Sequence, residues 1–196
     1  MKKLLVTLMA LSATSVFADD IRLGQPAYGG NGCPQGTASA VLSPDAKTLS
    51  ILFDQYTAEA GNATGRAVDR KSCNVAIPVH VPNGFSMSLF KVDYRGFNSL
   101  PAGGSSRLNV DYFFAGQRGP SYSKTFYGEQ NANYLLTNTL NNSTVVWSPC
   151  GAETNLRINS SLMAQSNRYG QQTLSTVDSA DIKSGLIYHI QLRACR

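Results

Sequence analysis

The chain has 196 residues, of which 15% are charged, and its formal net charge is +5 at pH 7. A chain of this length is long enough for one domain with a proper hydrophobic core, but not comfortably for two. The small excess of basic residues is spread along the chain, so it lacks the basic patch that marks a nucleic-acid-binding protein. We therefore expect one domain and exclude nucleic acid as a partner.

The first residues predict a secretory signal peptide. Lys2 and Lys3 precede an apolar stretch, 4–11, that is too short to span a bilayer stably and is followed by small residues. We expect cleavage to separate a signal peptide, 1–18, from a single domain, 19–196, and to leave no integral membrane segment. The short Lys-Lys signal is typical of bacteria. The protein is thus predicted to be secreted, either periplasmic or extracellular.

The rest of the chain reads as a succession of short β-strands. Leu49, Ile51 and Phe53, for example, alternate with polar residues as in a half-buried strand, and no later window has a helical period. The segment 58–71 is small, polar and loop-like. Segments with β character are 37–43, 48–57, 74–81, 85–94, 107–114, 121–127, 134–140, 144–147, 155–164, 173–177 and 186–194. This pattern predicts an all-β fold, an antiparallel β-sandwich that is jelly-roll-like.

Two residues predict local features of these strands. Pro78 lacks the N–H that a strand donates to its neighbour, which suggests that its strand lies at the edge of a sheet. The apolar phase of the following strand switches between Leu89 and Phe90, as expected for a β-bulge. His80 is expected to point outward from the core.

Four cysteines predict two disulfides, because their number is even and the chain is exported. They are Cys33, Cys73, Cys150 and Cys195. If the first three strands run up, down and up, Cys33 and Cys73 lie at the same end, which favours their pairing and leaves Cys150 with Cys195. Three strictly alternating strands after Cys150 would place Cys195 at the far end, so the second pairing requires that one segment crosses over or is not a full strand.

No residue pattern predicts catalysis, a metal site or a cofactor. The only histidines, His80 and His189, both fall on polar faces of predicted strands, and the Gly-x-Ser-x-Gly motif of a nucleophile elbow is absent. Asp93 and Asp111 could act as the paired carboxylates of a glycan-acting hydrolase if their strands formed a hairpin. Acidic residues on neighbouring strands also arise by chance in a β-rich chain, so a structural role is favoured for Asp93 and Asp111.

Aromatic residues in polar surroundings are the candidate binding residues. Tyr28, Phe97, Tyr122 and Tyr127 could stack against sugars or meet a partner surface. Trp147, close before Cys150, is instead expected to pack on a disulfide.

The segments around the cysteines resemble a known family. They are Gly30-Asn-Gly-Cys-Pro-Gln-Gly, Arg70-Lys-Ser-Cys-Asn, Val146-Trp-Ser-Pro-Cys-Gly and the terminal Gln191-Leu-Arg-Ala-Cys. With these motifs the chain resembles, over nearly the whole predicted domain, the secreted fungal and bacterial family called domain of unknown function 4360. The resemblance implies secretion and a β-rich disulfide fold, but no activity or catalytic residue.

Together these features predict an exported, non-catalytic module that binds a polysaccharide, an envelope component or a partner protein. The alternatives are a secreted hydrolase of glycans and a structural protein of the envelope or matrix.

Overall fold

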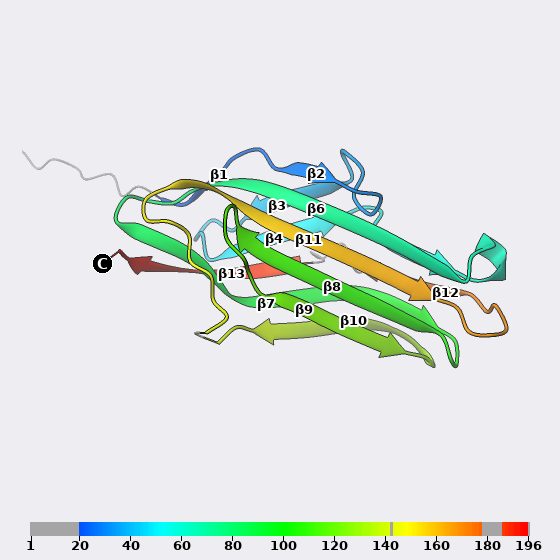
Figure 1. The fold of residues 1–196 in the computed structure, drawn as a ribbon. Coiled ribbons are helices and arrows are strands. Elements are labelled where there is room, and N and C mark those ends of the chain that lie inside the picture. Colours follow the sequence, from blue (N-terminus) through cyan, green and yellow to red (C-terminus); the bar gives the residue numbers. More distant parts are fainter. Residues whose placement is uncertain (1–19, 142, 178–185, 196) are drawn as a thin grey trace, which may run out of the picture.

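The strands form two antiparallel sheets that pack face to face in the computed structural model (Figure 1). The structure describes residues 20–141, 143–177 and 186–195. The expected signal peptide and its cleavage site lie outside these residues. In the described part of the chain, no helix has the length and apolar character needed to cross a membrane. The predicted antiparallel β-sandwich is confirmed.

The first sheet contains six strands around a long central pair, β6 and β11. Two short strands, β1 and β2, both pair with the same edge of β6, and β11 continues to β8 and β9. The strands are β1 (Arg22–Leu23), β2 (Ala27–Gly29), β6 (Val68–His80), β8 (Ser105–Phe114), β9 (Ser121–Tyr127) and β11 (Glu153–Gln165).

The second sheet contains seven strands arranged around β7. On one side β7 pairs with β10; on the other it pairs with β13 and then with β12. Beyond these, β4 pairs with β13, β5 pairs with β12, and β3 pairs with β4. The strands are β3 (Ala38–Leu42), β4 (Thr48–Phe53), β5 (Thr57–Ala60), β7 (Phe85–Leu100), β10 (Gln130–Thr139), β12 (Thr173–Val177) and β13 (Leu186–Ala194).

The path of β12 and β13 explains the second disulfide. Both strands run antiparallel to β7, β12 along Gly96 to Ser99 and β13 along Phe85 to Tyr94, so they make a single interrupted pass. The chain after Cys150 therefore goes out along β11 and returns along β12 and β13 to the end where it started. Both predicted pairings, Cys33–Cys73 and Cys150–Cys195, are confirmed.

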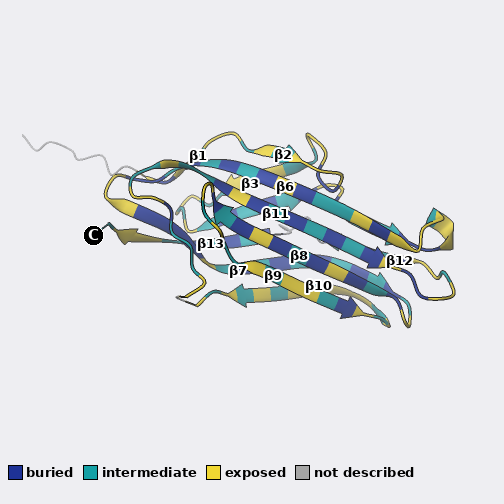
Figure 2. Cartoon of the chain, in the orientation of Figure 1, coloured by how far each residue is buried: buried dark blue, intermediate teal, exposed yellow. Residues whose placement is uncertain are grey.

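The interior combines aliphatic residues with buried tyrosines. Buried and less buried residues alternate along the long strands, as the two-residue period of a strand requires (Figure 2). Tyr56, Tyr94 and Tyr188 are among the largest fully buried side chains. Burial raises the pKa of each of these phenols far above its ordinary value, and it raises the pKa of Tyr112 to about 12. These tyrosines therefore stay protonated at physiological pH and serve as packing residues.

The bulge predicted in β7 is confirmed. The register shifts between His189 and Ile190, which lie opposite Lys91 and Leu89, so Phe90 is the extra residue. Phe90 is consequently exposed, and its ring lies 5.9 Å from that of His189.

Pro78 is not in an edge strand, because β1 and β2 lie beside β6. The proline is accommodated where the chain passes between these two short strands, and its carbonyl accepts a hydrogen bond from Gly24 (2.8 Å). The N–H and C=O of one residue in a strand point to the same side. The side on which Pro78 lacks an N–H therefore faces the gap between β1 and β2. The proline therefore costs the sheet no hydrogen bond.

Two further segments differ from expectation. The predicted strand 144–147 is a crossover segment that forms one isolated bridge with the second sheet, Trp147 with Ser88, and the carbonyl of Val146 also accepts a hydrogen bond from Ser88. The predicted loop 58–71 contains most of β5, the short 3-10 helix η1 (Asn62–Thr64) and the start of β6. Polar residues dominate the start of β6, so the alternation of apolar and polar residues that predicts a strand is absent there.

Candidate functional site

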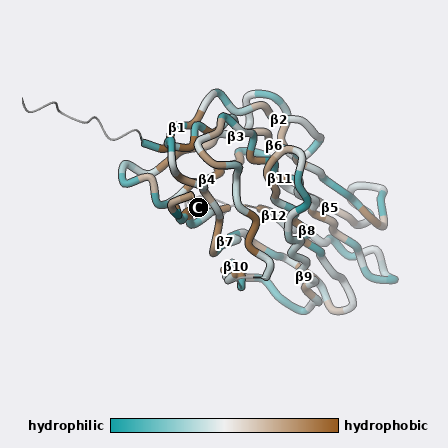
Figure 3. The backbone as a smooth tube through the Cα atoms, turned by 60° about the vertical axis from the view of Figure 1, so that its left-hand side comes forward, coloured by the Kyte–Doolittle hydropathy of each residue, from teal (hydrophilic) through white to brown (hydrophobic). Residues whose placement is uncertain are grey.

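A polar pocket lies at one end of the sandwich, where the loop around η1 meets the loop that follows β11. These loops are at the right-hand end of Figure 1, beyond the strands, and the loops are mostly pale or teal in the hydropathy colouring (Figure 3). The pocket has a volume of about 580 Å³. We call it the loop-end pocket; its lining residues are Gly61, Asn62, Gly65, Arg66, Ala67, Ser166, Asn167, Arg168, Tyr169 and Gly170.

The two loops are hydrogen-bonded to each other. The backbone N–H of Asn62 donates to the carbonyl of Gly170 (2.8 Å), and the N–H of Gly61 donates to the carbonyl of Arg66 (2.7 Å), which closes the first loop. Gly170 has a positive φ of 67°, and a Cβ at this position would lie 2.1 Å from Oδ1 of Asn62. The positive φ therefore favours glycine where the loops touch, and any larger residue would also displace the side chain of Asn62.

Asn167 organises the second loop from the inside. Its side chain is nearly buried, and its Oδ1 accepts hydrogen bonds from the backbone N–H groups of Tyr169 (3.0 Å) and Gln171 (3.2 Å). Its Nδ2 donates to the carbonyl of Ala102 (2.8 Å), in the turn between β7 and β8. The loop after β11 is thereby fixed to the loop around η1 and to the turn between β7 and β8, even without a ligand.

The pocket carries positive charge and an open aromatic ring. The guanidinium of Arg168 lies over the ring of Tyr169, 4.6 Å from its centroid, and Tyr169 is still 65% exposed. Arg66 pairs with the buried carboxylate of Asp69 (3.2 Å), which Lys71 also approaches (3.7 Å). In the described part of the chain no carboxylate forms a salt bridge with Arg168.

Tyr127, one of the predicted binding residues, lies at the same end of the first sheet. It is opposite Ser105, which is in turn opposite Gln165, the residue before the pocket loop. Two strand spacings, roughly 10 Å, therefore separate Tyr127 from the strand that leads into the pocket. Its side chain is 73% exposed.

The other predicted binding residues lie elsewhere. Tyr28, in β2, is half-buried and packs against the core, where burial raises the pKa of its phenol. Phe97 is half-buried in β7, in the second sheet. Tyr122 is stacked on Tyr94 with 4.6 Å between ring centroids. None of the three lines the loop-end pocket, and their role in binding stays a prediction.

Tyr169 is not among the predicted binding residues, although its sequence surroundings have the same features that predicted Tyr28 as one. It is an aromatic residue in a polar, glycine-containing stretch between two strands. The sequence does not show that residues 61–67 and 166–170, which are about a hundred positions apart, contact each other.

A second polar cluster surrounds Asp93 in the second sheet. Its carboxylate accepts hydrogen bonds from Thr137 (2.6 Å) and His189 (2.8 Å), and Lys91 lies 3.6 Å away. Burial alone would raise the pKa of Asp93, but the two hydrogen bonds and the charge of Lys91 outweigh it and hold the pKa below its usual value. Among the described residues, no serine, threonine or cysteine hydrogen-bonds to His189.

The hairpin that would bring Asp93 and Asp111 together does not form. The two residues lie in β7 and β8, which belong to different sheets. Each alternates with buried neighbours, so the two side chains point away from the interior on opposite faces of the sandwich. No group of three or more metal-ligating side chains occurs among the residues that the structure describes.

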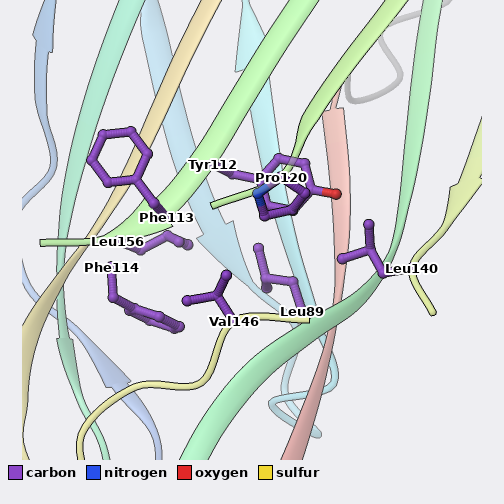
Figure 4. A pocket seen from close by; sticks show the side chains of 8 residues that line it. All are labelled: Leu89, Tyr112, Phe113, Phe114, Pro120, Leu140, Val146 and Leu156. Atoms are coloured by element: carbon purple, nitrogen blue, oxygen red, sulfur yellow. The ribbon is translucent and has the colours of Figure 1, made fainter. Parts of the chain in front are cut away.

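Three other spaces occur in the described part of the chain. One of about 740 Å³ lies beside the Cys150–Cys195 disulfide and is lined by Ser86, Cys150, Arg193, Ala194 and Cys195, with Arg193 lying over the ring of Trp147. The other two are apolar. A small apolar void between the sheets is lined by Leu89, Tyr112, Phe113, Phe114, Pro120, Leu140, Val146 and Leu156 (Figure 4). Its volume of about 10 Å³ is at the lower limit for one water molecule. A wider pocket of about 480 Å³ at the opposite end is mainly apolar, with Phe85 and Leu192 in its wall.

Comparison with known proteins gives the family. Residues 19–195 match the family described as domain of unknown function (DUF4360). The chain belongs to this family. It is also 36% identical over 178 residues to an uncharacterized secreted protein of Arthroderma benhamiae, an alignment that covers 90% of this chain and 73% of the relative. The secreted relative and the two disulfides fit an exported protein. The relative is fungal, and the bacterial origin suggested by the signal peptide stays a prediction.

Proposed function

We propose that this protein is a non-catalytic carbohydrate-binding module whose loop-end pocket holds the acidic groups of a carboxylated polysaccharide. The observation that carries the proposal is the pair formed by Arg168 and the exposed ring of Tyr169 in a polar pocket. A sugar unit presents an apolar ring face together with hydroxyl groups. The free face of the Tyr169 ring, with amide donors nearby and the guanidinium of Arg168 over the other face, matches both features.

The charge of the pocket supports an acidic ligand. A guanidinium binds a carboxylate through two parallel hydrogen bonds. Arg168 donates one hydrogen bond to the hydroxyl of Tyr169, and it has no acidic partner among the described residues. Arg66 already pairs with Asp69, so it contributes only a weaker second positive charge to the pocket. Because both arginines are exposed, their attraction for an acidic chain falls as salt concentration rises.

The composition of the pocket supports binding without catalysis. Most glycosidases use two carboxyl groups that flank the scissile bond. None of the residues that line the loop-end pocket is acidic. A bound sugar would therefore meet hydrogen-bond donors and an aromatic face, but no acid and base pair.

The test is calorimetric titration of the oxidised domain, residues 19–196, with polygalacturonate oligosaccharides and with neutral galactan oligosaccharides of equal length. We expect saturable binding of the acidic chains, weakened about tenfold by Arg168→Gln and also weakened by Tyr169→Ala. Arg157→Gln, an exposed arginine near the opposite end of β11, is the matched control and should leave the affinity unchanged. Absence of binding by the wild-type domain, or equal affinities for wild type and Arg168→Gln, would overturn the proposal and favour a protein partner or a structural role.

A further inference from the structure

An edge of the second sheet is open along β10. This strand pairs with β7 on one side, and on its other side no strand among the described residues lies beside it. It is ten residues long and contains no charged residue and no proline. Proteins usually protect long edge strands with charges, prolines or bulges, because the unpaired backbone groups otherwise attract another strand.

The register identifies which backbone groups are open. Leu140, directly after β10, donates its N–H to Phe90 of β7 (2.9 Å), and alternate residues of an antiparallel pair share this orientation. The even-numbered residues of β10 therefore face β7. The N–H and C=O groups of the odd-numbered residues point to the open edge; these residues are Asn131, Asn133, Leu135, Thr137 and Thr139.

The outward set is symmetric about its middle residue, Leu135. If a second copy of β10 runs antiparallel along this edge, centred on Leu135, each of these residues can use both its N–H and its C=O. Leu135 is then opposite Leu135 of the second copy, Asn133 is opposite Thr137, and Asn131 is opposite Thr139. The two leucines, each 62% exposed in the single chain, cover one another, and no like charges are opposed.

We infer that two copies of this protein associate through antiparallel pairing of their β10 strands, which joins the two second sheets into one continuous sheet. The inference is independent of the proposed ligand, because the loop-end pocket contains no residue of β10. The commonest symmetry of soluble oligomers, a two-fold axis, is the one this pairing generates.

The first test is the mass of the oxidised domain in sedimentation equilibrium over a range of protein concentrations. We expect twice the mass of one chain for the wild type. Leu135→Lys should give one chain mass, because it places two like charges on the two-fold axis. Val41→Lys changes a residue in β3 that is 53% exposed and should leave the dimer intact. Thermal unfolding of all three proteins checks that the fold is retained.

A second test reads the register directly. In this pairing the two Leu135 residues have Cα atoms about 5.5 Å apart, within the range that a disulfide bridges. Leu135→Cys should form a covalent dimer under mild oxidation, whereas Asn131→Cys should not, because Asn131 lies opposite Thr139. A wild-type protein that stays monomeric at all concentrations, or equal cross-linking by both cysteine variants, would overturn the inference. In that case, only a strand from a different protein would be left as the partner of the open edge of β10.

Discussion

The side-chain amide of Asn167 donates a hydrogen bond to the backbone carbonyl of Ala102, 2.8 Å away. This contact joins the loop after β11 to the turn between the two sheets. It holds the backbone on which Arg168 and Tyr169 are displayed.

Asn167→Ala should lower both stability and affinity. The variant loses this hydrogen bond and the two that Oδ1 accepts, which we expect to lower the free energy of unfolding by about 1–3 kcal/mol. Affinity for the acidic oligosaccharide should fall as well, because the loop must be ordered on binding. Urea unfolding and calorimetry measure the two effects. Asn74→Ala, an exposed asparagine in β6, is the control and should change neither.

Tyr127→Ala should weaken the binding of long chains selectively. Tyr127 stands two strand spacings, roughly 10 Å, from the strand leading into the pocket, so only an extended oligosaccharide can reach both. We expect about fivefold weaker binding of long acidic chains and no change for a single sugar acid. Tyr127→Phe keeps the ring and should bind as the wild type does. An equal loss for short and long ligands would show that Tyr127 acts through the fold instead.

The two disulfides should differ in their resistance to reduction. Cys33 and Cys73 are fully buried, whereas Cys150 is exposed, so mild reductant should open Cys150–Cys195 first. The sequence separations of 40 and 45 residues correspond to about 4 kcal/mol of stabilisation each on the chain-entropy account. Timed alkylation with peptide mapping gives the order of opening, and urea unfolding of Cys150→Ser/Cys195→Ser gives the loss. Simultaneous opening of both bonds would contradict the difference in burial.

Asp93→Asn should lower stability at neutral pH but not in acid. The folded-state pKa of Asp93 is depressed, so its charged form contributes stability above the unfolded pKa of about 3.9. That contribution disappears as the pH falls through the lower folded-state pKa. We expect a deficit of about 1 kcal/mol near pH 7 that shrinks as the pH falls below 3.9, measured by urea unfolding at a series of pH values. Asp111→Asn, in an exposed position of β8, is the control; a deficit that persists in acid would rule out charge as its cause.

Local patterns predicted those features that depend on neighbouring residues. The bulge at Phe90 follows from the phase switch in β7, and alternation located most strands. The Cys33–Cys73 pairing was predicted correctly but on a wrong strand count, because β3, β4 and β5 lie between Cys33 and β6, and Cys73 is in the middle of β6 and not at its start. The polar start of β6 lacks this alternation, and for that reason the prediction of a loop over 58–71 is wrong.

Features that depend on the pairing of distant strands could not be predicted. The loop-end pocket exists because Val68 of β6 lies opposite Gln165 of β11, which brings two remote loops together. The accommodation of Pro78 likewise depends on the gap between β1 and β2. Asp93 and Asp111 are close in sequence, yet β7 and β8 belong to different sheets, which sequence spacing cannot reveal.

The most direct test of the loop-end pocket is residue-resolved NMR titration of the ¹⁵N-labelled, oxidised domain with an acidic galacturonate oligosaccharide. We expect amide shifts to concentrate at residues 61–67 and 166–170, with smaller changes near Tyr127, and the same titration at high salt to give weaker binding. No shifts at saturating ligand, or shifts confined to another face such as the Asp93 cluster, would contradict the assignment of this pocket as a carbohydrate site.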